Sequence, residues 1–166
     1  LALARTHLAD SPSLLVQATA ALDEAAIRGT QGDAPKALML SLAGKELAER
    51  SGWHRGMVVG TLNCAHFYVA LGEADKASAY VKEALRLGGR SRNYDSALTG
   101  TRLQLAMALG QVEEVAAILA EASTTEFSSL DSWYEVSVLE ALVRARLKER
   151  RWTEAIKNAD EAISAE

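Results

Sequence analysis

The chain has 166 residues, of which 49% are hydrophobic, and its 18 basic and 22 acidic side chains give a formal charge of −4. Alanine occurs 31 times and leucine 23 times, whereas valine and isoleucine together number 14 and proline occurs only at Pro12 and Pro35. Alanine and leucine favour helices, and β-branched residues favour strands. The composition therefore excludes a large sheet and a disordered chain, and it predicts an all-α protein.

Several classes of protein are excluded by simple features. One cysteine, Cys64, cannot form an internal disulfide, and no stretch approaches the 18 apolar residues that a membrane span needs. The first residues lack the basic and apolar regions of a signal peptide, so we expect a cytoplasmic protein without a membrane partner. The acidic balance argues against direct nucleic-acid binding. Because the chain does not begin with methionine, we expect it to be one module of a longer protein.

Helical spacing of apolar residues runs through the whole chain. It predicts helices at 1–9, 13–29, 33–51, 54–71, 74–88, 93–109, 112–123, 129–149 and 152–165. Asp33 stands where an N-cap would, and Pro35 falls in the first turn of its helix. Gly72 and Gly110 follow the last leucine of a helix, where a left-handed residue commonly ends it.

The sequence repeats itself. A turn residue, usually glycine, is followed five positions later by a small residue in four places, and these small residues are Ala37, Ala77, Val115 and Ala155. Their spacings are 40, 38 and 40 residues, and each unit between them contains two predicted helices. A pair of helices cannot bury its apolar stripe alone, so such units stack on one another.

The unit from Thr61 to Leu85 resembles a tetratricopeptide repeat (TPR). Ala65 matches the small position of the first helix and Tyr68 its aromatic position, whereas Ala77 and Ala84 match the small positions of the second helix. Arg28, Ala106 and Arg146 replace the aromatic in the other units. The resemblance implies one domain over residues 1–166, a right-handed superhelix of about four helix pairs with units at roughly 13–51, 54–88, 93–123 and 129–165, and residues 1–9 as the remnant of a preceding unit.

A repeat of about 40 residues is longer than the usual 34. In this respect the chain is similar to the helical region of MalT-like bacterial transcription activators and related signalling proteins. The resemblance implies a non-catalytic module that binds a protein, a peptide or a small ligand as the interaction or sensory part of a regulatory protein. A scaffolding repeat that self-assembles and has no specific groove ligand is the alternative.

No residue pattern points to catalysis or to a cofactor. Cys64 and His66 are two residues apart on one predicted helix, so their side chains point about 200° apart and cannot pair. We expect Cys64 to be a buried structural residue. The three histidines are scattered without metal-ligand spacing, which argues against a metal site. These features favour a protein that is not an enzyme.

The candidate binding surface is the concave face that the first helices of the units would line. Aligning the units on their turns gives a polar ladder of His66, Gln104 and Arg144, with Glu140 one turn from Arg144, beside an apolar strip of Val69, Met107 and Leu147. A mixed surface of this kind suits a peptide or a small polar ligand. These residues could equally be ordinary exposed side chains.

Two further surfaces stay open. Five of the eight residues from Arg144 to Arg151 are basic, and they are either a patch for an acidic partner or cations gathered at a helix C-terminus. The apolar stripe of the last helix pair has no further helix to cover it within the chain. We therefore expect some of Leu139, Leu142, Val143, Ile156 and Ile163 near an open edge, and either a homodimer through the C-terminal helices or a further repeat.

Overall fold

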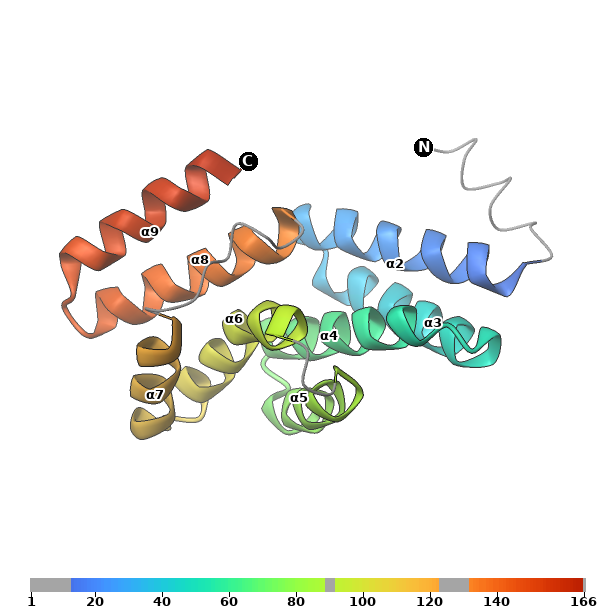
Figure 1. Ribbon diagram of the computed structural model, residues 1–166, viewed down its shortest axis with the longest axis horizontal. Coiled ribbons are helices and arrows are strands. Elements are labelled where there is room, and N and C mark those ends of the chain that lie inside the picture. Colours follow the sequence, from blue (N-terminus) through green and yellow to red (C-terminus); the bar gives the residue numbers. More distant parts are fainter. Residues whose placement is uncertain (1–12, 89–91, 123–131, 166) are drawn as a thin grey trace. The chain divides into compact units, whose positions relative to one another are not determined.

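The computed structural model describes residues 13–88, 92–122 and 132–165, and every regular element in these segments is an α-helix (Figure 1). The prediction of an all-α protein is therefore confirmed for this part of the chain. The predicted bounds agree with the observed ones within one residue, except at the start of α8, where the predicted residues 129–131 lie outside the described residues. The predicted helix at 1–9 lies outside the described residues. The helices are α2 (Leu14–Thr30), α3 (Ala34–Ser51), α4 (His54–Ala70), α5 (Ala74–Gly88), α6 (Arg92–Ala108), α7 (Val112–Ala122), α8 (Ser132–Lys148) and α9 (Trp152–Ala165).

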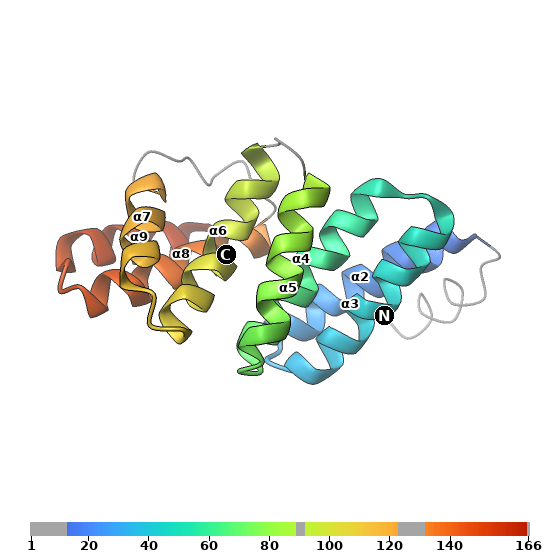
Figure 2. The same cartoon turned by 90° about the horizontal axis from the view of Figure 1, so that it is seen from below.

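The chain divides into two compact units, residues 1–87 and residues 88–166. The first contains the helices from α2 to α5, and the second contains those from α6 to α9 (Figures 1 and 2). Each unit consists of two helical hairpins. A continuous superhelix over residues 1–166 stays a prediction.

The four hairpin turns share one geometry. The first helix of each hairpin ends at a residue with left-handed backbone: Gly32 (φ 77°), Gly72 (φ 75°), Gly110 (φ 68°) and Arg150 (φ 59°). In every turn the next amide donates to the carbonyl five residues before it: Asp33 to Arg28 (2.9 Å), Glu73 to Tyr68 (2.9 Å), Gln111 to Ala106 (3.0 Å) and Arg151 to Arg146 (2.9 Å). This double-capped helix end satisfies carbonyls that would otherwise lack donors. The turns predicted from the sequence repeat are therefore confirmed as equivalent structures.

The start of α3 follows the predicted capping chemistry. The Asp33 side chain accepts a hydrogen bond from the Lys36 backbone amide (3.2 Å), and Pro35 lies in the first turn, where its missing N–H costs little. Both features were expected from the sequence.

Glycine allows the helices of the first unit to approach closely. A Cβ atom on Gly44 of α3 would lie 2.8 Å from the Leu22 side chain of α2, and one on Gly60 of α4 would lie 2.8 Å from Cβ of Lys45 on α3. No side chain larger than hydrogen fits at either crossing. The helix α4 is consequently enclosed over most of its circumference, and its buried residues are Gly56, Val58, Gly60, Thr61, Leu62, Asn63, Cys64, Ala65 and Phe67.

The small residues of α5 are buried as predicted. Ala77 is 0% exposed and Ala84 is 2% exposed. The Tyr68 ring of α4 and the Tyr80 ring of α5 lie 5.3 Å apart between centroids, which joins the two helices of this hairpin. An ion pair between Lys45 Nζ and Glu83 Oε1 (3.2 Å) links α3 to α5.

The second unit has one hydrophobic cluster built around α8. This helix contributes five of its buried residues, and α6 and α7 contribute the other five. The cluster consists of Leu103, Ala106, Ile118, Leu119, Ala122, Val138, Leu139, Ala141, Leu142 and Ala145. Met107, Val115 and Ala162 pack against it from the side.

The predicted open edge is found on α9 alone. Ile156 and Ile163 are 62% and 73% exposed, as expected, but Leu139 and Leu142 are only 2% and 1% exposed. Some of the five candidate residues are therefore exposed, whereas these two leucines are buried because α8 packs against both α6 and α9. Val143 is half-buried.

Candidate binding surface

The predicted ladder residues have different surroundings. His66 of α4 is half-buried, and its ring meets the Phe67 ring edge-on with 5.2 Å between centroids. Burial lowers the pKa of His66 from 6.5 to about 4. The imidazole is therefore uncharged at neutral pH, so His66 adds hydrogen-bonding capacity to a surface but no positive charge.

The other ladder residues lie in the second unit. Arg144 and Glu140 are exposed one turn apart on α8, and Arg144 Nη2 lies 2.5 Å from Glu140 Oε1. Gln104 on α6 is half-buried. The ladder from His66 through Gln104 to Arg144 joins residues of both units, so it stays a prediction.

The predicted apolar strip is divided in the same way. Val69 of the first unit is half-buried, and Leu147 of α8 is 44% exposed. Met107 of α6 packs against the hydrophobic cluster of the second unit. Of the seven predicted site residues, Met107 lines a pocket between helices of the second unit.

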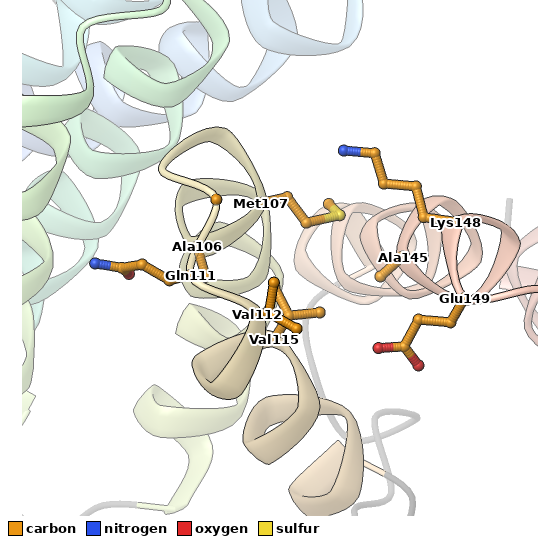
Figure 3. Close-up of a pocket in the computed structure, with 9 residues that line it drawn as sticks. Ala106, Met107, Gln111, Val112, Val115, Ala145, Lys148 and Glu149 are labelled. Atoms are coloured by element: carbon orange, nitrogen blue, oxygen red, sulfur yellow. The ribbon is translucent and has the colours of Figure 1, made fainter.

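That pocket lies between the α6–α7 turn and the C-terminal end of α8, and its volume is about 200 Å³ (Figure 3). Met107 extends from α6 toward α8, whereas Gln111 points away from α8. Val112, which is 70% exposed, and Val115 form the side contributed by α7. The lining consists of Ala106, Met107, Gly110, Gln111, Val112, Val115, Ala145, Lys148 and Glu149.

The chemistry of this pocket suits one apolar group. Its walls are mainly methyl, methylene and thioether groups, and Met107 can adapt to different shapes because its side chain is unbranched. Lys148 and Glu149 add a cation and an anion on the α8 side. Pockets for drug-sized ligands measure about 300–1,000 Å³, so this pocket holds a single side chain or a group of that size. Sequence periodicity could not reveal it, because it is formed where three helix ends meet.

The basic run at the end of α8 is largely neutralised by glutamates. Arg151 Nη2 lies 2.5 Å from Glu154 Oε2, and Arg144 pairs with Glu140. Arg146 is only 5% exposed. These pairings favour ion pairing within the hairpin over a continuous patch for an acidic partner.

Arg146 was missed as a buried residue by the sequence analysis. It donates from Nη1 to Oδ1 of Asn158 on α9, and its Nε lies 3.6 Å from Glu154 Oε2. Burial lowers the pKa of Arg146, although the Glu154 carboxylate opposes this effect. Its position offered a signal, because it stands four residues before the turn residue, where Tyr68 stands in the second hairpin. A residue at this place points toward the second helix of the hairpin.

Cys64 is buried as predicted, at 0% exposure. Burial raises the pKa of its thiol to about 12. The thiol is therefore protonated and shielded, and it cannot act as a nucleophile in this state. Within the described segments, no group of three His, Cys, Asp or Glu side chains could hold a metal ion.

None of the helices in the described segments is long and apolar enough to cross a membrane. No family model matches the sequence, and no curated protein and no solved structure is significantly similar to it. The residues and geometry of the chain itself therefore carry the functional argument.

Proposed function

We propose that this chain is a non-catalytic binding module of TPR-like helical hairpins, which holds an apolar side chain of a protein or peptide partner in the pocket beside Met107. The observation that carries this proposal is the pocket at the α6–α7 turn. Its volume of about 200 Å³ is close to that of cavities that hold one benzene-sized group. A peptide anchored by one leucine or phenylalanine fits this size, whereas a large cofactor does not.

The surroundings of the pocket support a peptide rather than an isolated small molecule. Leu109, which directly follows α6, and Leu147 on α8 are 45% and 44% exposed, and both helices line the pocket. Gln104 and the Arg144–Glu140 pair lie on the same two helices. An apolar anchor with polar groups along the same helices is the arrangement that extended or helical peptides use.

The TPR-like part of the proposal rests on the turns. Four hairpins have a residue with left-handed backbone at the same place in the turn and the same backbone hydrogen bond, and they recur at spacings of 40, 38 and 40 residues. Stacked hairpins of this kind present extended binding surfaces. The regulatory setting, in a protein similar to MalT-like activators, rests on the resemblance of the sequence alone.

The non-catalytic part is supported by the state of the two most reactive side chains in the first unit. The Cys64 thiol is buried with a pKa of about 12, and His66 has its pKa lowered to about 4. A general base is most effective with a pKa near the working pH. Neither group meets that condition at neutral pH.

The test is selection of peptides from a random library displayed on phage, with the full chain as bait. Selected peptides should carry a conserved apolar residue, because the pocket holds one such side chain. Val112→Glu places a charge at the pocket while the residue stays largely exposed, so the fold should be retained. We expect this variant to bind the selected peptides with an affinity at least tenfold lower than that of the unmodified chain, measured by fluorescence anisotropy.

Ile156→Glu is the matched control, because Ile156 is exposed on α9 and does not line the pocket. It should leave the affinity of the selected peptides within about twofold. If the selected peptides bind Val112→Glu and the unmodified chain with equal affinity, the pocket is not the binding site. A chain that selects no peptide and instead forms large assemblies would support the scaffolding alternative.

A further inference from the structure

A second apolar surface lies on α9, and none of its residues lines the pocket. Trp152, Ile156 and Ile163 recur at i, i+4 and i+11, which places them along one side of the helix. They are 56%, 62% and 73% exposed, respectively. We call this surface, together with Asp160 between the two isoleucines, the α9 face.

The first unit shows how an equivalent surface is covered. Counted from the turn residue, Ile156 and Ile163 stand six and thirteen positions after Arg150, as Leu38 and Lys45 stand after Gly32. Leu38 and Lys45 are half-buried rather than exposed. The helix α4 lies against α3 there, since a Cβ on Gly60 would be 2.8 Å from Cβ of Lys45. The same side of the second helix is thus packed against a helix in one hairpin and exposed in the other.

Charge argues against a second copy as the occupant. Asp160 is exposed within the α9 face and stands ten residues after the turn residue, where α3 has the apolar Leu42. Two α9 helices packed antiparallel through this face would bring their Asp160 carboxylates to the same side of the contact, because Asp160 lies between the two isoleucines along the helix and to one side of them. Like charges at such a contact are destabilising. A helix with a cation at this point would instead be attracted.

We propose that the α9 face binds an amphipathic helix of a partner protein, which packs on it as α4 packs on α3. Glycine or alanine on that helix lies opposite Ile163, as Gly60 lies opposite Lys45. A lysine or arginine one turn further along lies beside Asp160. This surface and the pocket beside Met107 use different residues, so the two proposals can fail separately.

The probe is a synthetic peptide of residues 53–71, which contains α4, with Cys64 replaced by lysine. Cys64 stands one turn after Gly60 on the same side of α4, and Leu42 stands one turn before Lys45 on α3. In an antiparallel pair these two positions are neighbours, so the new lysine should reach Asp160. The labelled peptide is titrated with the full chain, and binding is followed by fluorescence anisotropy.

We expect saturable binding that Ile163→Glu weakens at least tenfold. Leu15→Glu, which changes an exposed leucine on α2 that belongs to neither surface, should bind the peptide with the affinity of the unmodified chain. A peptide that also carries Gly60→Leu should bind at least tenfold more weakly, because the larger side chain prevents the close crossing. Circular dichroism melting of both chain variants checks that they remain folded.

The charge at Asp160 is tested separately. The peptide with glutamate at position 64 should bind several-fold more weakly than the lysine peptide, and Asp160→Asn in the full chain should remove most of that difference. Equal binding of the peptide by Ile163→Glu and by the unmodified chain would overturn the proposal. It would also be overturned by concentration-dependent self-association that Ile163→Glu abolishes, because a second copy would then cover the face.

Discussion

Arg150 and Gly72 have the same backbone conformation. The angle φ is 59° at Arg150 and 75° at Gly72, and each amide donates to the carbonyl three residues earlier, Leu147 (3.1 Å) and Val69 (3.0 Å). Arg150 is the one non-glycine residue with positive φ among those the structure describes. A side chain costs about 1 kcal/mol or more in this region because Cβ approaches the carbonyl oxygen. The α8–α9 hairpin therefore contains a strained turn that the three other hairpins avoid.

Replacing Arg150 by glycine should remove this strain. We expect Arg150→Gly to raise the free energy of unfolding by about 1 kcal/mol, which corresponds to a melting temperature higher by about 2–4 °C for a protein of this size. Arg150→Ala keeps the strain and loses the same charge, so it should give no such gain. A glycine variant no more stable than the alanine variant would show that the turn is not strained.

The position of Ala77 should not accept a larger side chain. Ala77 is 0% exposed on α5, so Ala77→Leu should lower the free energy of unfolding by about 1–3 kcal/mol through overpacking. Urea denaturation measures the change. Ala79 is exposed on the same helix, and Ala79→Leu should change stability by no more than about 0.5 kcal/mol. Equal effects at the two positions would place Ala77 outside the tightly packed interior.

The buried contact between Arg146 and Asn158 should stabilise the α8–α9 hairpin only while both partners are present. Asn158→Leu leaves the guanidinium buried with one acceptor fewer, and we expect it to cost about 2 kcal/mol. Arg146→Met combined with Asn158→Leu removes both polar partners and should recover most of that loss. A double-mutant cycle measured by chemical denaturation gives the coupling between the residues. Simple additivity of the two changes would argue against the contact.

His66 should make stability depend on pH. Its pKa is about 4 in the folded chain and about 6.5 in an unfolded chain. Between these values only the unfolded chain binds the additional proton, so the free energy of unfolding falls as pH drops through 6.5 and the loss is complete below about 4. The total effect is on the order of 2–3 kcal/mol. His66→Asn should remove this part of the pH dependence.

Titration of the His66 ring followed by NMR provides the direct measurement for this prediction. A midpoint near 6.5 in the folded protein would show that the ring is more hydrated than its packing against Phe67 indicates. In that case the stability of His66→Asn and of the unmodified chain would change with pH in parallel.

The sequence was sufficient to predict most of the helices because their ends have local causes. Asp33 and Pro35 begin α3, and Gly72 and Gly110 end α4 and α6 through a backbone conformation that glycine adopts freely. Arg150 was placed correctly only because it occupies the glycine position of the repeat. No property of arginine itself predicts a left-handed turn.

The candidate binding surface was less predictable because it depends on contacts between helices. Met107 was among the predicted site residues, but Val112 and Val115 were not. In the structure Val112 is 70% exposed at the pocket. Periodicity shows which side of a helix is apolar, but it does not show whether another helix covers that side. The same reason explains why Leu139 is buried and Ile163 is exposed.

The equivalence of the four turns also bears on how such a chain changes in length. The turn inside each hairpin adopts a conformation that the next hairpin reproduces, at intervals of 38–40 residues. Duplication or loss of one interval within the genome therefore rejoins helices in a compatible register. The chain can grow or shorten by whole hairpins, and a new hairpin brings a fresh first helix on which different surface residues can be selected.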